Sequence, residues 1–517
     1  MADEHEQRET IQFLRDPASY PAGAAPIEVV ETHASIVFLA GRYAYKLKRA
    51  VKYPYLDFST VARRQAACAA ELRLNRRTAP QLYLEVRPIS RRADGRLQWG
   101  RGADATAAAV DFVVVMRRFD QHDLLDNVAA RGDLSAPLLY ALCAHIAAFH
   151  AAAERHRTMG GGAAMAAIAA TAIAVLRERR TAGFPVAQID RFADAMRSEL
   201  ARLAALLDER RAAGKVRRVH GDLHLRNVCL VDGRPVLFDC IEFSEDLATI
   251  DVLYDLAFLL MDLDHRGLRG FANLVMNRYL DLTEEDAGLA TMPAFLALRA
   301  AIRAHITATM AEHGWGEAAP DAEYAEARRY LAEAEAALAP APTRLVAIGG
   351  LSGSGKSTLA AGLAAELGRR PGARVLRSDV LRKLHFGSDP ESQLPPEAYT
   401  PEVNERVYRD LCDRARVALR AGYAAIIDAV ALRPDDRRAF AAVAASAGVP
   451  FTGLWLDAPP SAMAARLGAR RGDASDASHA VLQLQLAHDP GVIEWTRIDA
   501  GGNAETAQAA ARRALLH

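Results

Sequence analysis

The sequence predicts two domains: an α+β domain that begins with strands and continues in helices, and then an α/β domain with a parallel sheet. Three observations support this. The first hundred or so residues read as short strands, residues 124–337 read mostly as helices, and beyond residue 343 apolar strands alternate with helices. The composition shifts at the Ala- and Pro-rich stretch 332–343. We therefore predict a first domain at 1–340, with lobes at about 28–118 and 123–335, and a second at 341–517.

In the first domain, ASIVFLAG and RYAYKLKR predict a hairpin around Gly41. A helix at about 59–79 follows, and then strands at LYLEVRPISRR, GRLQW and VDFVVVMRRF. After an alanine-rich helical region, VCLV and VLFD flank an Asp-Gly pair, which predicts a second hairpin. Helices resume from residue 251 to about 337.

In the second domain, the strands are RLVAIGG, ARVLRSD, YAAIIDA, FTGLWLDAP and a short one near WTRIDA. Helical stretches separate them, and this alternation predicts a parallel sheet with helices on both faces. We find no internal repeat between the two domains.

Composition excludes several classes of protein. The 64 basic and 64 acidic residues balance, which argues against a dedicated nucleic-acid binder or a membrane-surface protein. Five cysteines without a CxxC pair indicate reduced thiols and a cytoplasmic location. The most apolar stretch, residues 160–176, is too rich in small residues for a membrane span and reads as the helix of a soluble protein. The oligomeric state is not predicted.

The strongest motif lies at residues 350–357, where GLSGSGKS matches the pattern GxxxxGK[ST] between a predicted strand and a predicted helix. Its glycines let backbone N–H groups curl around a phosphate, and the helix N-terminus adds partial positive charge. Lys356 would reach the β- and γ-phosphates, and Ser357 would ligate Mg²⁺. The predicted ATP-binding residues here are Gly350, Ser352, Gly353, Ser354, Gly355, Lys356, Ser357 and Thr358.

The second domain thereby resembles small-molecule P-loop kinases, such as gluconate kinase and chloramphenicol phosphotransferase, and also polynucleotide kinase and the zeta toxins. The resemblance implies that Asp379, at the end of VLRSD, faces the acceptor hydroxyl and that Asp428, at the end of AAIID, organises Mg²⁺. Arg466 and Arg470, with Arg471, would form a lid over the phosphates, although a solvated helix face explains any one of them equally well.

The first domain carries His220-Gly-Asp222, with Asn227 five residues beyond the aspartate, which fits HxDxxxxN. In this pattern Asp222 meets the acceptor hydroxyl, and Asn227 reaches back to a metal on the ATP phosphates. Asp239, after the second hairpin, is the expected second metal ligand. The alternative is that His220 and Asp222 only cap a turn.

These residues resemble the aminoglycoside phosphotransferase family over about residues 28–330, which implies a protein-kinase-like fold. The resemblance also implies a lysine on a strand that pairs with a helix glutamate, and Glu71 is the natural partner. Lys46 and Lys48 are two of only six lysines and share one strand face; we prefer Lys46, but the sequence does not separate them. Residues 114–119 would form the hinge that contacts adenine. We expect Asp251 to hold the catalytic loop.

The whole chain resembles bacterial bifunctional proteins that join an aminoglycoside phosphotransferase-like domain to an AAA-type P-loop ATP-binding domain. This implies an ATP-dependent phosphotransferase with ATP and Mg²⁺ as cofactors and hydroxyl groups of small molecules as acceptors. Two alternatives remain: one domain senses nucleotide without turnover, or the P-loop domain phosphorylates nucleic-acid ends. Zero net charge and the absence of interleaved aromatic and basic residues weigh against the last.

Overall fold

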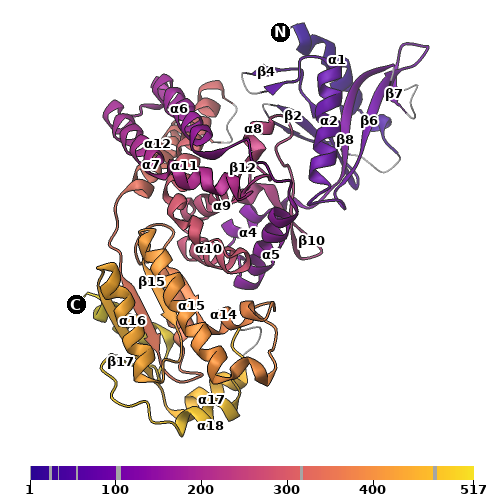
Figure 1. Cartoon of the computed structure of the whole chain (residues 1–517). Helices are drawn as coiled ribbons and strands as arrows, with labels where there is room; N and C mark the ends of the chain where they lie inside the picture. Colours follow the sequence, from indigo (N-terminus) through magenta and orange to yellow (C-terminus); the bar gives the residue numbers. More distant parts are fainter. Residues whose placement is uncertain are drawn as a thin grey trace. The chain divides into compact units, whose positions relative to one another are not determined.

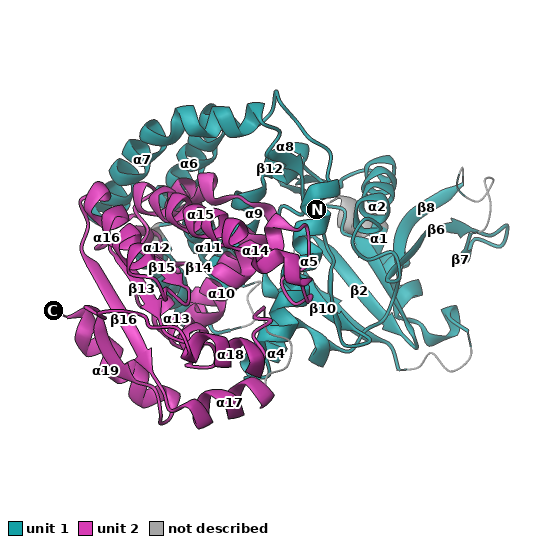
Figure 2. Cartoon of the chain, turned by 60° about the horizontal axis from the view of Figure 1, so that its bottom comes forward, with its two compact units in different colours: residues 1–262, 298–332 teal, residues 263–297, 333–517 magenta. Residues whose placement is uncertain are grey.

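The chain folds into two compact units, each of which we describe by itself (Figure 2). Our computed structural model describes residues 2–516 apart from 22–25, 33, 54–55, 101–105, 107, 315–317 and 470–473. Unit 1 comprises residues 1–262 and 298–332, and unit 2 comprises residues 263–297 and 333–517. We call residues 263–297 the insert, because they precede the predicted boundary at 340 and nevertheless belong to unit 2.

Unit 1 begins with helix α1, which is followed by an antiparallel sheet in the order β1-β2-β3-β8-β6-β7. Strands β2, β8, β6 and β7 of this sheet are labelled in Figure 1. Val113 and Val115 of β8 point into the core cluster that includes Leu14 of α1, whereas Val114 points into the cluster that includes Cys68 of α2. Burial on both faces explains why this strand is a continuous apolar run. The bounds are α1 (Ala2–Arg15), β1 (Glu28–Glu31), β2 (Ser35–Ala40), β3 (Tyr43–Lys48), α2 (Val61–Asn75), β6 (Tyr83–Arg91), β7 (Leu97–Trp99) and β8 (Ala109–Arg117), with a small β4–β5 pair (Lys52–Tyr53, Leu56–Asp57).

Both predicted hairpins are present. Gly41 turns between β2 and β3 with a φ of 57°, a conformation that glycine adopts readily. Strands β10 (Val228–Val231) and β11 (Arg234–Leu237) pair antiparallel around Asp232 and Gly233, whose φ angles of 51° and 72° suit the tight hairpin turn that Asp-Gly favours.

Helices form the rest of unit 1. Helix α6 packs on α7 so closely that a Cβ on Gly162 would lie 3.1 Å from the backbone of Ala204. Within the described residues, α6 is the one helix whose length and composition would suit a membrane span, and a single such helix is weak evidence for one. The bounds are α4 (Leu125–Ala130), α5 (Ala136–Ala152), α6 (Gly161–Glu178), α7 (Val186–Ala212), α8 (Glu245–Ala248), α9 (Val252–His265), α11 (Met292–His313) and α12 (Pro320–Leu338), with β9 (Val216–Arg218) pairing β12 (Thr249–Asp251).

Unit 2 contains the predicted parallel sheet, in the order β14-β15-β13-β16-β17. Side chains of β13, β15 and β16 pack with α13 and α19 in one core cluster. The strands are β13 (Leu345–Gly349), β14 (Arg374–Arg377), β15 (Ala425–Asp428), β16 (Phe451–Asp457) and β17 (Thr496–Asp499). The helices are α10 (Arg269–Thr283), α13 (Lys356–Ala364), α14 (Ser378–His385), α15 (Pro401–Arg420), α16 (Pro434–Ala447), α17 (Pro460–Ala469), α18 (His479–Leu486) and α19 (Ala504–Leu515).

Candidate active sites

The glycine-rich loop of unit 2 runs from the end of β13 into α13, as the motif predicts. Gly350, Gly353 and Gly355 have φ angles of 134°, 81° and 101°. A Cβ on Gly350 would lie 2.7 Å from the Leu456 carbonyl oxygen, and one on Gly353 would lie 2.6 Å from that of Met463. Conformation requires glycine at all three positions, and space also requires it at Gly350 and Gly353. Within the loop, the N–H groups of Gly350, Ser352 and Ser354 are hydrogen-bonded to the protein.

A group of hard oxygen donors lies beside this loop. The Ser357 hydroxyl donates to Asp428 Oδ2 at 2.6 Å, and Asp428 is the last residue of β15, next to β13 in the sheet. Arg377 donates to the same hydroxyl at 3.1 Å and lies 3.4 Å from Asp428 Oδ2. The predicted pair of metal ligands is thus brought together.

These residues fit a magnesium nucleotide. Within the described part of the chain, no group of three or more His, Cys, Asp or Glu side chains is arranged so that it could hold a metal ion. Mg²⁺ commonly takes one or two protein oxygens and completes its shell with phosphates and water, so a hydroxyl and one carboxylate suffice. The buried Ser354 hydroxyl has no hydrogen-bond partner among the described residues, which suits a loop that receives an oxygen-rich ligand.

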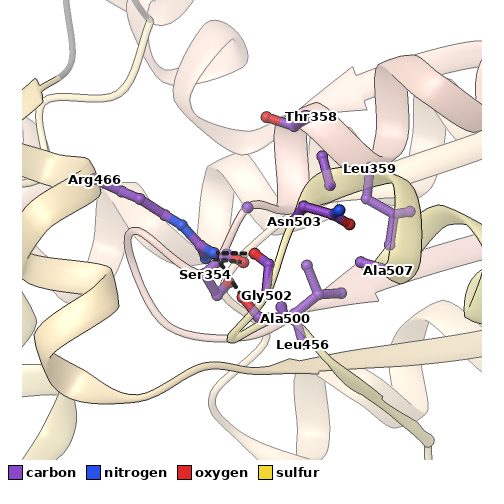
Figure 3. Close-up of a pocket in the computed structure, with 11 residues that line it drawn as sticks. Ser354, Thr358, Leu359, Leu456, Arg466, Ala500, Gly502, Asn503 and Ala507 are labelled. Atoms are coloured by element: carbon purple, nitrogen blue, oxygen red, sulfur yellow. Dashed lines mark hydrogen bonds between the residues drawn. The ribbon is translucent and has the colours of Figure 1, made fainter.

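A cavity of about 200 Å³ adjoins the phosphate loop (Figure 3). Arg466 reaches across it and donates to the carbonyls of Ser354, Ala500 and Gly502, at 3.3, 2.7 and 3.0 Å. Arg466 thus lies beside the phosphate loop, and its role in a lid stays a prediction; Arg470 and Arg471 lie outside the described residues. The lining residues are Ser354, Gly355, Thr358, Leu359, Leu456, Arg466, Ala500, Gly502, Asn503, Ala504 and Ala507. The loop between β17 and α19 supplies three of them and the start of α19 supplies two, and this segment carries no motif that predicts it.

Asp379 lies near the carboxyl end of β14 in the first turn of α14, whereas the sequence placed it in the strand, which ends two residues earlier. Its carboxylate has no hydrogen bond or ion pair among the described residues. Its charge adds to the burial that raises the pKa of Tyr408, so the two side chains are neighbours. A half-buried carboxylate without a protein partner is available to an acceptor hydroxyl.

The two lysines of β3 both pair with Glu71 of α2, as expected, and then diverge. Lys46 also pairs with Asp239 at 2.6 Å, and its side chain is 13% exposed. Lys48 pairs with Glu242, and its side chain is 2% exposed. Burial alone would lower the pKa of Lys46, but the Asp239 and Glu71 carboxylates outweigh it and raise that pKa, so the ammonium stays charged.

Asp239 itself has a left-handed φ of 63°, and its N–H donates to the Tyr83 hydroxyl at 3.1 Å. A non-glycine residue in this region is strained, and such strain gathers at functional sites. Burial raises the pKa of Glu242, whose carboxylate pairs with Lys48. The Asp239 side chain is more exposed than that of Glu242. Lys46 and Asp239 therefore form the accessible part of this charge cluster.

The catalytic-loop residues also come together. Asn227 Nδ2 donates to both the carbonyl and the Oδ2 of Asp222 at 2.8 Å, and His224 lies 3.3 Å from that Oδ2. Burial opposes ionisation of Asp222, but His224 and His220 outweigh it and lower its pKa, so the carboxylate is charged at neutral pH. The Asp222 side chain is 40% exposed, so it remains open to an acceptor.

The prediction that Asp251 holds this loop is wrong. Asp251 is the last residue of β12 and makes a bidentate ion pair with Arg210 at 2.7 and 2.8 Å. The buried Asp255, one turn further into α9, accepts the N–H groups of His220 and Gly221 at 3.2 and 2.8 Å. Seven residues on, Asp262 accepts the N–H of Leu225 at 2.9 Å, so one face of α9 fixes the loop at two points.

Comparisons with known proteins agree with the two kinds of domain. The profile of the phosphotransferase enzyme family matches residues 55–295, and that of an AAA domain matches residues 345–489. A protein of Mycobacterium tuberculosis, described only as uncharacterized, is 31% identical over 490 residues, which are 93% of each chain. A Mycobacterium bovis protein of the same description matches with the same identity and coverage.

Solved structures resemble each part separately. An unliganded sugar kinase from Janibacter is 27% identical and covers 34% of this chain and 95% of its own, with a TM-score of 0.27. A choline/ethanolamine kinase family protein from Mesorhizobium loti is 16% identical and covers 63% of this chain and 99% of its own, with a TM-score of 0.38.

Proposed function

The chain belongs to one family with these mycobacterial proteins and joins a phosphotransferase-family domain to an AAA-type P-loop domain, and on this premise we propose that it transfers phosphate from ATP at two separate sites. Each site would hold Mg²⁺-ATP and pass the γ-phosphate to a hydroxyl of a small molecule. The main support is a repeated arrangement: each unit holds a lysine, metal-binding oxygens and an aspartate open to an acceptor.

At the first site, Lys46 would hold the phosphates, and Asn227 and Asp239 would hold the metal. Asp222 would orient the acceptor hydroxyl and finally take its proton. Asp255 and Asp262 keep the loop in place, so that Asp222 and Asn227 keep their spacing.

At the second site, the loop backbone, Lys356 and Arg466 would surround the phosphates, and Ser357 and Asp428 would hold the metal. Asp379 would receive the acceptor. The cavity between Thr358 and Asn503 would take the nucleoside end. Free, buried cysteines fit a cytoplasmic enzyme, and we propose neither a membrane nor a nucleic acid as a partner.

Phosphate transfer from labelled ATP to pooled metabolites tests the proposal. We expect Lys356→Ala to remove one set of labelled products and Asp222→Asn to remove another, because each variant disables one site. Asp239→Ala should weaken Mg²⁺-ATP binding at the first site, whereas Asp222→Asn should leave it nearly intact. The absence of any labelled product would refute double transfer, and ATP binding without turnover at one site would identify a sensor there.

A further inference from the structure

Residues 263–295 of the insert lie within the range matched by the phosphotransferase family, yet the insert is built into unit 2 (Figure 2). Its helix α10 packs against α13 and α14. Helix α13 begins with Lys356 and Ser357, and α14 carries Asp379 in its first turn. The insert is thus in contact with both helices that present the P-loop site.

The insert covers the open edge of the parallel sheet. Strand β14 is an edge strand, so its outer N–H and C=O groups have no neighbouring strand. Asn273 and Asn277, one turn apart on α10, donate to the Ala373 carbonyl at 2.9 and 3.1 Å. Asn277 Oδ1 accepts the Val375 N–H at 2.8 Å. Two asparagine side chains therefore take the place of a sixth strand.

A buried ion-pair network fixes the same strand. The Arg374 side chain is 0% exposed and donates to Asp286 at 2.7 Å, to Asp281 at 2.6 Å and to Asn277 at 3.1 Å. Asp286 also pairs with Arg414 of α15 at 2.9 Å. A buried guanidinium that lost these partners would be costly, so the network holds β14 in one position relative to the insert.

Strand β14 leads directly to the metal-binding oxygens. Three residues after Arg374, Arg377 donates to Ser357 Oγ and lies beside Asp428. At about 3.3 Å per residue, roughly 10 Å of extended chain separates the two arginines. A displacement of the first part of β14 is therefore carried to the guanidinium that contacts both predicted magnesium ligands.

We propose that the insert is a working part of the P-loop phosphotransferase, in which Asn277 and Arg374 are positioning residues that set Arg377, and through it Ser357 and Asp428, for magnesium. This rests on the proposed function of the P-loop site. Groups that orient metal ligands from behind commonly change metal affinity by about 10- to 100-fold when they are removed. A segment that the sequence assigns to one domain would then serve the active site of the other.

The test measures how much Mg²⁺ is needed for a fluorescent ATP analogue to bind the full chain, in an Asp239→Ala background that weakens the first site. We expect Asn277→Ala to raise the half-maximal Mg²⁺ concentration about tenfold. Asn277→Asp keeps an acceptor for Val375 N–H and Arg374, so it should return the value toward that of the background protein. Val443→Ala, a truncation in the buried face of α16, serves as the control for general loosening.

An unchanged Mg²⁺ requirement in Asn277→Ala would overturn the inference, as would an equal increase in Val443→Ala. If Asn277→Ala does not fold, Asn273→Ala replaces it. This change removes one bond to Ala373 and one from Asn277 but keeps the bonds of Asn277 to Val375 and Arg374, so a smaller increase is expected. If the background protein shows no Mg²⁺-dependent binding that Lys356→Ala removes, the proposed function of the P-loop site fails, and this outcome is distinct from the others.

Discussion

Replacing Lys46 and Lys48 separately with methionine should produce two different defects. Both side chains pair with Glu71, but Lys46 reaches the exposed side of the cluster at Asp239, whereas Lys48 is enclosed with Glu242. We expect Lys46→Met to weaken ATP binding at the first site with a modest loss of stability. We expect Lys48→Met chiefly to destabilise unit 1.

The magnitudes follow from the partners that each change leaves behind. A hydrogen bond to a charged group contributes about 1.5–3 kcal/mol, so loss of the Lys46 contact to phosphate should weaken affinity about 10- to 150-fold. Removing Lys48 leaves Glu242 without its cation in a buried place, and breaking such a pair costs about 3–5 kcal/mol. In either variant Glu71 would still pair with the lysine that remains. Each variant therefore serves as the control for the other.

The assay combines binding of a fluorescent ATP analogue with thermal unfolding, in a Lys356→Ala background that silences the P-loop site. Affinity is compared only at temperatures at which each variant is folded. Equal losses of affinity in the two folded variants would refute the assignment of Lys46 to the phosphates. Full affinity in Lys46→Met would refute it more directly.

Three further predictions use other parts of the chain. Asp379→Ala should keep ATP affinity and slow ATP hydrolysis but lower transfer to the acceptor about 10²- to 10⁴-fold, and equal loss of ATP binding would contradict its role. Asp255→Asn should lower turnover at the first site by about 10- to 100-fold in the folded protein, because it loosens the catalytic loop. Asp251→Asn should affect stability alone. The reverse result would support the sequence prediction that Asp251 holds the catalytic loop. Burial, with Arg179 nearby, lowers the pKa of His305 to about 4, so the unfolded chain takes up a proton at a higher pH than the folded chain does. Unit 1 should therefore lose about 2 kcal/mol of stability between pH 7 and pH 5. Denaturant unfolding of His305→Gln should not show this part of the loss.

The sequence predicted best what contiguous residues determine. The motif at 350–357 contains its own strand exit, glycine turns and helix start, so its geometry could be read directly. The geometry of the HxDxxxxN loop is equally predictable from the sequence, since Asp222 and Asn227 are five residues apart and meet through the local course of the chain. Lys46 and Lys48 could not be separated, because residues two apart on a strand share a face and only the distant Asp239 and Glu242 distinguish them.

The error at Asp251 concerns a distant contact. The sequence predicts that Asp251 holds the catalytic loop, but Asp251 ends strand β12, and Asp255 and Asp262 lie on one face of α9. The insert carried no signal, because Asn277 and Arg374 lie almost a hundred residues apart and Arg374 is one arginine among many in this chain. Such partnerships arise only when the sheet edge and the helix have folded.

The asparagine side chains that cover the edge of β14 also affect whether the two domains could exist as separate proteins. A protein cut in the linker near residue 340 would leave the P-loop half with a bare sheet edge, and bare edges pair with neighbouring molecules and aggregate. A free-standing relative of this half would need its own helix, a shorter edge strand or charged side chains at that place. Residues 298–332 belong to unit 1, so a cut before residue 263 would remove part of that unit. Separation of the two domains would therefore be tolerated more readily if residues 263–297 were duplicated.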